Sequence, residues 1–405
     1  MTHNCSAGEL DATLGVVSDA VIDMLNAPIE DARGLPNEAF TSEAFFELEK
    51  ERLFPRTWTF AGTASDIPNV GDARPTNVAG NPVILVRQKG NGIGVFHNVC
   101  PHRGSRLLTE PVVGERAIVC PYHAWSFELD GQIRGRTHYH GCDKHETDAD
   151  MYGRNDCLVP VRSHTFHDWI FVNLDGKAPP FEDYAGTTLD CFENYELATL
   201  DRERHITIDY RCNWKLAIEN FCDYYHIFKI HPALDQAFDK VYRRSTYPEG
   251  RHLFGEQKIT ARHGLSTQSN EIVLPDLAEL TEEQKSHHFF ISLFPNFLLN
   301  LFPSNIQGIW FEPTALDYTV MHMWFYYAQG VAEAEQFRGA RDEVVEEWLV
   351  VNGEDADICH RLQLGRESGA YDGGHFAPYW DEGLINFHKQ VAYATRGEGA
   401  YAPVG

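Results

Sequence analysis

The sequence predicts an α+β protein, in which a small all-β domain precedes a larger domain where helices cover an antiparallel β-sheet. From Trp58 to about Asp175, short apolar runs alternate with Gly, Pro and Asn turns, which is the pattern of short strands. Beyond it follow an amphipathic helical pattern near 213–230, a strand-rich block at about 288–328 and further helical segments. A chain of 405 residues has room for two or three domains.

Three parts are expected along the chain. Residues 1–45 should form a helical N-terminal segment that packs on the larger domain, with Thr41 or Ser42 as the N-cap of the helix that follows. The all-β domain is expected over 46–176, because a turn sequence and a pair of prolines follow its last apolar run. The remaining residues, 177–405, are expected to form the larger domain.

Two short loops of the all-β domain carry the strongest chemical signal. Cys100 and His102 lie in the first loop, and Cys120 and His123 in the second, so that each loop supplies one thiol and one imidazole. Two thiolates suit one iron of a [2Fe–2S] pair and two imidazoles suit the other, which is the ligand set of a Rieske centre. A Cys₂His₂ zinc site uses the same residue types, but zinc fingers usually pair Cys with Cys and His with His. The spacing therefore favours electron transfer.

A second group of candidate ligands lies on the helix expected over 213–230. Its apolar stripe consists of Trp214, Ile218, Phe221 and Tyr225. The other side carries Glu219, Asp223 and His226. His231 stands immediately before a proline, so the helix should end just before it, and His231 can then turn back toward His226. These residues form either an ordinary solvated helix face or part of the two-His, one-carboxylate triad that binds non-haem iron.

Both constellations resemble those of the aromatic-ring-hydroxylating oxygenases, which combine a Rieske domain with a catalytic non-haem iron domain. The stretches HNVCPHRGSRLL and CPYHAWSFELDGQIRG are similar to the Rieske domain of this family. Residues 219–232 match its iron-binding motif, E-N-x-x-D-x-Y-H-x₄-H-P, at nearly every defined position. The resemblance covers about residues 36–400. It implies a catalytic alpha subunit, with a Rieske [2Fe–2S] domain and a helix-grip catalytic domain.

In the family resembled, the iron-binding carboxylate comes from a late helix, for which 353–363 is the candidate segment. Gly353 is expected to break the chain before a helix that starts with Glu354, Asp355 and Asp357, where the helix dipole favours acids. Asp355 lies in line with an expected apolar stripe of Ile358, Cys359 and Leu362. A buried carboxylate needs a partner, so Asp355 is the favoured ligand. The alternative is that the three acids only interact with the dipole in the first turn of the helix and bind no metal.

The resemblance also implies a role for Asp223. The matching Asp of the family connects an iron-binding His to a Rieske His of the neighbouring subunit. Here, Asp223 would connect His226 with His102 or His123 across the interface of a homotrimer, which would allow electron transfer between subunits. A local hydrogen bond to a tyrosine is the alternative role for this side chain.

The implied function is that of a terminal oxygenase component. Electrons from NAD(P)H would come through a separate flavin/iron–sulfur reductase and pass the Rieske cluster to a mononuclear Fe(II), where O₂ is activated for insertion into a small organic substrate. The chain has no G-x-G-x-x-G dinucleotide fingerprint, which is consistent with a separate reductase. A Rieske electron-transfer protein with a ligand-binding domain and a zinc-stabilised binding module are the alternatives of other classes.

The candidate substrate pocket consists of Asn220, Phe221, Phe297, Asn305 and Trp310. The short spacing between Asn220 and Asp223, together with the run E-D-x-x-I-C, resembles the branch of the family that monooxygenates or N-demethylates methylated and quaternary amines. An aromatic box would bind such a cation through cation–π attraction. Dihydroxylation of an aromatic ring or an aromatic carboxylate is the main alternative.

The composition disfavours other classes of function. A formal net charge of −25 argues against binding to nucleic acids and to anionic membrane surfaces. No apolar run approaches the ~20 residues that span a bilayer, and the first residues lack the pattern of a secretory signal. Nine irregularly spaced cysteines indicate reduced thiols and metal ligands, and hence a cytoplasmic protein.

Overall fold

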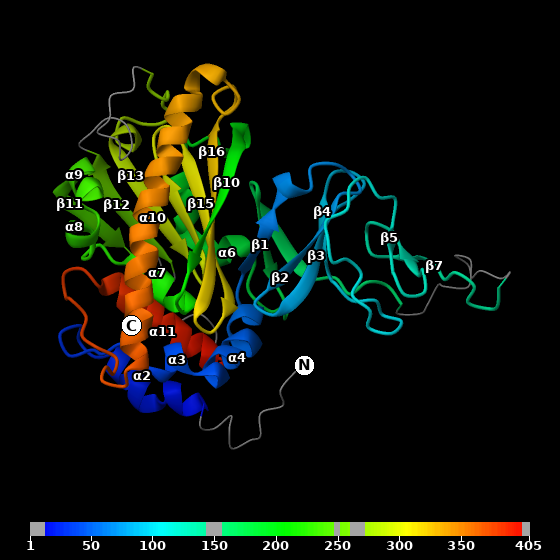
Figure 1. The fold of residues 1–405 in the computed structure, drawn as a ribbon, viewed down its shortest axis with the longest axis horizontal. Coiled ribbons are helices and arrows are strands. Elements are labelled where there is room, and N and C mark those ends of the chain that lie inside the picture. Colours follow the sequence, from blue (N-terminus) through cyan, green and yellow to red (C-terminus); the bar gives the residue numbers. More distant parts are fainter. Residues whose placement is uncertain (1–12, 143–155, 247–251, 260–271, 399–405) are drawn as a thin grey trace. The chain divides into compact units, whose positions relative to one another are not determined.

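The computed structural model describes residues 13–142, 156–246, 252–259 and 272–398 (Figure 1). The chain divides into two compact units. The smaller unit comprises Phe54–Ala178, and the larger unit combines Met1–Leu53 with Pro179–Gly405. The N-terminal helices and the C-terminal half of the chain therefore belong to one body. Among the described residues, no helix is both long enough and apolar enough to cross a membrane.

In the described part of the smaller unit, nine short strands form three antiparallel sheets, with the orders β1-β9-β8, β2-β3-β4 and β5-β6-β7. The strands are β1 (Thr59–Thr63), β2 (Ala73–Val78), β3 (Asn81–Arg87), β4 (Ile93–His97), β5 (Ile118–Val119), β6 (Ser126–Phe127), β7 (Ile133–Gly135), β8 (Arg162–Phe166) and β9 (Trp169–Asn173). The turns on either side of β3 contain Gly80 and Gly90, whose φ angles of 89° and 84° favour glycine. One core of this unit packs Ile118, Phe127 and other apolar side chains around Cys100 and Cys120.

The larger unit is built on a seven-stranded antiparallel sheet with the order β10-β16-β15-β14-β13-β12-β11 (Figure 1). Its strands are β10 (Leu200–Tyr210), β11 (Phe238–Thr246), β12 (Leu253–Ile259), β13 (His287–Leu293), β14 (Phe297–Leu301), β15 (Ile306–Ala315) and β16 (Tyr318–Ala328). Most residues of the central strands are buried on both faces, because helices cover this sheet. The predicted α+β class is confirmed.

The helices of the larger unit come from both ends of the chain. They are α2 (Asp19–Leu25), α3 (Glu38–Thr41), α4 (Glu43–Arg52), α6 (Phe181–Ala185), α7 (Trp214–Cys222), α8 (Ile227–Ile230), α9 (Pro232–Ala237), α10 (Arg338–Glu367) and α11 (Glu382–Arg396). Ser42 is the N-cap of α4, since its side chain accepts a hydrogen bond from Phe45 N at 3.3 Å. Figure 1 shows α10 running across the sheet.

The prediction of one continuous helix over 213–230 is wrong. The helix α7 ends at Cys222, and Asp223 has extended backbone angles of φ −96° and ψ 118°. The Asp223 carboxylate accepts a hydrogen bond from Tyr225 N, and such a local bond competes with helical pairing of the backbone. Tyr225, which the expected apolar stripe included, is consequently half exposed.

The expected break at Gly353 is also wrong, because α10 continues through this residue for 30 residues in all. A glycine inside a helix costs only about 1 kcal/mol relative to alanine, which the packing of a long helix outweighs. Glu354, Asp355 and Asp357 therefore lie within a helix and not in its first turn. Asp355 and Cys359 are buried as expected, whereas Leu362 is exposed and Gln363 takes its place on the buried side.

Candidate metal centres

The two Cys-His loops of the smaller unit fold in the same way. In each loop the Cys N–H donates to the carbonyl five residues later, at 2.8 Å, and the Cys carbonyl accepts from the N–H four residues later, at 3.0 Å. That fourth residue has a positive φ in both cases, 73° at Gly104 and 55° at Ala124. The repeated pattern of the sequence thus produces two equivalent loops, each with a Cys at its base.

The cysteines and the histidines of these loops differ in exposure. Cys100 and Cys120 are buried, whereas His102 is exposed and His123 is half-buried. The two imidazole rings are neighbours, with centroids 4.8 Å apart. His102 also stacks on Trp125, with centroids 4.4 Å apart and ring planes 4° from parallel. The loops therefore place the thiols on the inner side of the site and the imidazoles on the outer side.

This set of donors fits a [2Fe–2S] cluster with two thiolate and two imidazole ligands. Burial and the neighbouring thiol of Cys120 raise the pKa of Cys100, while the backbone N–H groups of His102 and Arg103 lower it by hydrogen bonding to the sulfur. The Nδ1 atom of His123 is buried without a hydrogen-bond partner in the part of the chain that the structure describes. Adjacent buried thiols and an unpaired imidazole nitrogen are groups that a bound cluster satisfies.

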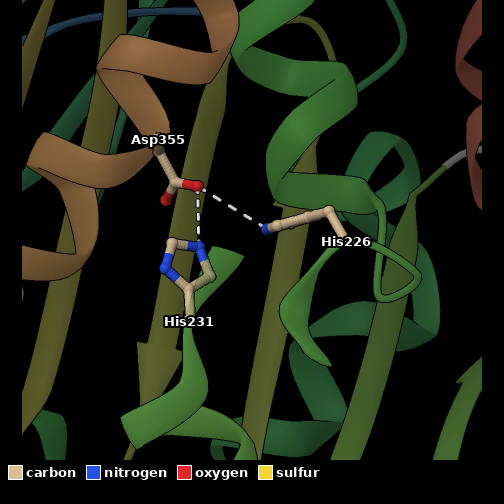
Figure 2. A group of neighbouring side chains, drawn as sticks. All are labelled: His226, His231 and Asp355. Carbon is tan, nitrogen blue, oxygen red and sulfur yellow. Dashed lines mark hydrogen bonds and ion pairs between the residues drawn. The ribbon is translucent and has the colours of Figure 1, made fainter. Parts of the chain in front are cut away.

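In the larger unit, His226, His231 and Asp355 converge on one point (Figure 2). His226 precedes α8 and His231 follows it, while Asp355 projects from the middle of α10. The Oδ1 atom of Asp355 lies 2.8 Å from Nε2 of His231 and 3.5 Å from Nε2 of His226. One potential ligand atom from each residue lies within 4.8 Å of the other two. The interruption between α7 and α8 brings both histidines to the same side.

Each of these imidazoles meets a second carboxylate at its other nitrogen. Nδ1 of His226 lies 3.2 Å from Asp223 Oδ2, and Nδ1 of His231 lies 2.7 Å from Glu354 Oε2. A carboxylate at Nδ1 holds the ring proton there and leaves the Nε2 lone pair free for a metal. Both histidines are thus oriented as metal ligands usually are in proteins.

The charges of the site favour ionised carboxylates. Burial would raise the pKa of Asp355, but hydrogen bonds from His226 and His231 outweigh burial and lower that pKa to about 2. Burial likewise opposes a charged His226, but hydrogen bonds to Asp223 and Asp355 raise its pKa to about 9, so a metal ion would take the place of the proton on Nε2. Two imidazoles and one carboxylate on one side of a site form the facial triad that binds Fe(II), so the residues present fit a mononuclear iron.

The acids that flank Asp355 differ in their surroundings. Asp357 is exposed and pairs with Arg361 on the same helix, at 2.8 Å. Glu354, which the sequence places at the flank of the apolar stripe, contacts His231. The only sequence signal for this contact is that Glu354 directly precedes Asp355. Two consecutive acids on one helix can reach the two nitrogens of the same ring.

Glu219 of α7 lies in a buried cluster of charges, which contradicts a solvated position beside Asp223 and His226. Its carboxylate lies 3.2 Å from the Arg366 guanidinium of α10 and 2.9 Å from Nε2 of His388 of α11. Burial opposes ionisation of Glu219, but these two partners, Arg366 first, lower its pKa. Neither partner is part of a sequence pattern that would identify it. This cluster anchors α7, and hence the residues that follow it, to the two C-terminal helices.

A cavity opens beside the triad and is lined by all three of its residues and by Asp223. The free space within it, part of which is open to solvent, amounts to about 510 Å³. Its apolar lining includes the aromatic side chains Phe221, Tyr224, Phe238, Phe290 and Trp348. Its polar lining includes Asn220, Gln257, His288 and Asn300. Apolar and aromatic walls with a few polar groups are typical of a site for a small organic molecule.

Two of the five candidate pocket residues, Asn220 and Phe221, line this cavity, whereas Phe297, Asn305 and Trp310 do not. Phe297 and Trp310 are direct partners in the sheet and so share a face. Asn300, which does line the cavity, is three residues from Phe297 on the same strand and so points to the opposite face. Whether a residue lines the cavity therefore depends on which of the two faces of its strand it occupies. The apolar pattern of these strands does not reveal which face meets the cavity.

Family models match both units of the chain. A model of the Rieske [2Fe-2S] domain matches residues 57–146, and a model of the ring hydroxylating alpha subunit (catalytic domain) matches residues 197–397. The candidate cluster ligands fall within the first match, and the triad falls within the second.

Curated relatives extend over most of the chain. A glycine betaine monooxygenase oxygenase subunit of Pseudomonas aeruginosa is 27% identical over 398 residues, which cover 91% of this chain and 90% of the relative. A carnitine monooxygenase oxygenase subunit of Acinetobacter pittii is 26% identical over 353 residues, which cover 84% and 86%. The solved structure of a quaternary ammonium Rieske monooxygenase has a similar fold, with a TM-score of 0.76 at 22% identity, covering 92% of this chain and 98% of that one.

Proposed function

Because the chain belongs to the Rieske-type ring-hydroxylating oxygenases, as a catalytic alpha subunit, we propose that it monooxygenates or N-demethylates a methylated amine. The observation that carries the proposal is the aromatic cavity that shares its walls with the His226, His231 and Asp355 triad. Aromatic rings attract ammonium cations, and an N-methyl group bound there would lie beside the metal site. The relatives that act on glycine betaine and carnitine support the same substrate class.

The metal groups would supply the redox chemistry. A [2Fe–2S] cluster at Cys100, His102, Cys120 and His123 would deliver electrons, and Fe(II) at the triad would activate O₂ for insertion into the substrate. A separate flavin/iron–sulfur reductase would provide these electrons from NAD(P)H, since the chain itself has no dinucleotide-binding fingerprint.

The protein's own residues orient and partly enclose the site. Asp223 and Glu354 hold the protons on Nδ1 of the two histidines, so that both Nε2 atoms stay available to the metal. The aromatic lining reduces the contact of the reacting centre with water. We further propose that Asp223 mediates electron transfer from the Rieske histidines of a neighbouring subunit in a homotrimer. The cytoplasmic location that the cysteine usage indicates stays a prediction.

Metal analysis tests the oxygenase centre. The protein should contain the two irons of the cluster together with one further iron per chain, and the His226→Ala variant should lose only the further iron. The visible absorption of the cluster should be the same in both proteins. Equal iron contents would support a pure electron-transfer protein, and a colourless zinc protein would contradict both readings.

Oxygen uptake tests the substrate class. With NADH and a suitable reductase, the protein should consume oxygen in the presence of one or more methylated amines, and a demethylated or hydroxylated amine should accumulate. Naphthalene and benzoate serve as the matched aromatic probes. Oxygen uptake coupled to product formation with these probes alone would support the ring-hydroxylating alternative instead.

A further inference from the structure

A chain of hydrogen bonds leads away from the cavity across neighbouring strands, along one face of the sheet. It begins at His288 of β13, whose Nε2 lies 3.3 Å from Asn300 Oδ1 of β14. Asn300 Nδ2 donates to Gln307 Oε1 of β15 at 3.1 Å, and Gln307 Nε2 donates to Asn305 Oδ1 at 2.9 Å. Asn305 Nδ2 donates in turn to Ser304 Oγ at 3.2 Å. Two of these side chains, His288 and Asn300, line the cavity.

The orientation of the Asn300 amide assigns the proton of His288 to Nε2. Asn300 donates its N–H to Gln307 and presents its oxygen to His288, so in this arrangement His288 donates from Nε2. Burial lowers the pKa of His288 to about 3, and the ring is therefore neutral. A neutral ring with its proton on Nε2 has a lone pair on Nδ1. Stacking on Phe302, with centroids 4.2 Å apart and planes 6° from parallel, holds the ring in place.

Nδ1 of His288 is buried without a hydrogen-bond partner among the residues that the structure describes, and the same is true of Oε1 of Gln257. Gln257 and His288 are direct partners on the neighbouring strands β12 and β13, so their side chains lie side by side on one face of the sheet. Both line the cavity. What distinguishes these two acceptors is that their residues are neighbours in the wall of the cavity, where a ligand that supplies a donor would satisfy them.

We propose that the substrate donates a hydrogen bond to Nδ1 of His288, with Oε1 of Gln257 as the adjoining acceptor, so that the enzyme selects amines that carry an N–H or O–H group. This inference rests on the proposed function and narrows its substrate class. The donor is either the N–H of an incompletely methylated ammonium group or a hydroxyl group elsewhere on the amine. The nearby ring of Phe290 and the ring of Trp348 provide the apolar walls for the cation.

A quaternary amine without a hydroxyl group would leave both acceptors buried and unpaired. A site built to hydrogen-bond its substrate discriminates strongly against an analogue that lacks the donor, because the polar groups of the protein then lose their partner. His288 and Gln257 are thus specificity-determining residues, whereas Asn300 and Gln307 act by fixing the proton on Nε2.

Binding of two matched pairs of amines tests the inference on the full chain with both metal groups bound. N,N-dimethylglycine differs from glycine betaine by an N–H in place of one methyl group, and L-carnitine differs from γ-butyrobetaine only by its hydroxyl group. In titration calorimetry without reductase, the donor-bearing member of one or both pairs should bind at least about tenfold more tightly than its counterpart. The pair that shows the preference identifies the N–H or the O–H as the source of the donor.

Three variants test whether the preference for donor-bearing amines depends on the hydrogen-bond chain. His288→Phe keeps the aromatic ring and should abolish the preference. Gln307→Leu, which lies outside the cavity lining, should weaken it, because Asn300 is then free to turn its N–H toward His288. His287→Phe is the matched control: it changes the neighbouring histidine on the opposite face of β13, and it should leave the preference unchanged. Iron content and visible circular dichroism establish that each variant is folded and loaded.

The possible outcomes separate the two proposals. Equal binding within both pairs, or a preference that persists in His288→Phe, would overturn the inference and leave the proposed function standing. Binding of an aromatic probe such as benzoate, with none of the four amines bound, would overturn the methylamine function and this inference together.

Discussion

Glu354 Oε2 lies 2.7 Å from Nδ1 of His231, although 123 residues separate the two along the chain. The next residue of the same helix, Asp355, contacts the other nitrogen of the ring at 2.8 Å. Two consecutive acids therefore contact the two nitrogens of one imidazole; by our proposal the first holds the ring proton and the second would bind the same metal as His231. This arrangement depends on the continuous helix α10, because a regular helix fixes the positions of both acids relative to the histidine.

Glu354→Gln should weaken metal binding at the triad without unfolding the protein. The amide cannot hold the Nδ1 proton as a carboxylate does, and loss of such a partner typically costs about 10- to 100-fold in metal affinity. Iron retained during dialysis against a chelator measures the effect. Asp357→Asn is the matched control, since this acid is exposed and pairs only with Arg361 among the described residues. Equal iron retention in both variants would rule out an orienting role for Glu354.

Asp223→Asn should weaken iron binding at the triad, as Glu354→Gln does, but with excess Fe(II) to load both metal sites its turnover should still fall by at least about tenfold. The carboxylate lies 3.2 Å from Nδ1 of His226, where it holds the ring proton and, by our proposal, mediates electron transfer. Iron content and the visible spectrum report the two sites, and rapid mixing of the reduced protein with O₂ and substrate reports reoxidation of the cluster. Normal reoxidation would contradict the electron-transfer role.

Lys215→Met should destabilise the larger unit by about 3–5 kcal/mol, because it leaves the buried carboxylate of Glu49 without its cation. The two side chains are fully buried and 2.7 Å apart, and Trp214 Nε1 donates to the same carboxylate at 3.0 Å. Burial raises the pKa of Glu49 and lowers that of Lys215, so each ion depends on the other. The double variant Glu49→Gln/Lys215→Met removes both charges and should recover most of the loss. Denaturation in urea measures both, and a double variant as unstable as Lys215→Met would refute the pairing argument.

His288 should make the protein less stable as the pH falls below 6.5, the ordinary pKa of histidine. Its pKa is about 3 in the folded state, so the unfolded chain takes up a proton there that the folded protein does not. This histidine should therefore lower the free energy of unfolding by about 1.4 kcal/mol per pH unit below that value. The difference between wild type and His288→Phe at pH 7 and at pH 5.5 isolates the contribution. A difference that does not change with pH would contradict a neutral, buried ring.

The sequence determined the parts of this protein in which ligands lie close together along the chain. Cys100 and His102, Cys120 and His123, and His226 and His231 are local pairs, and short spacings, together with the proline after His231, restrict each backbone enough to bring its pair to one site. The choice of Asp355 followed from its alignment with Cys359, although the expected start of the helix was wrong.

The tertiary structure alone decided the rest. The contacts of Glu354 with His231 and of Glu219 with Arg366 join segments more than a hundred residues apart, and no local preference of the chain specifies them. The cavity lining likewise depends on strand register, since a shift of one residue would exchange Asn300 for a core residue. Periodicity shows that a strand is buried on both faces. Which face meets the cavity, and which nitrogen of His288 contacts Asn300, depends on neighbours that only the folded chain brings together.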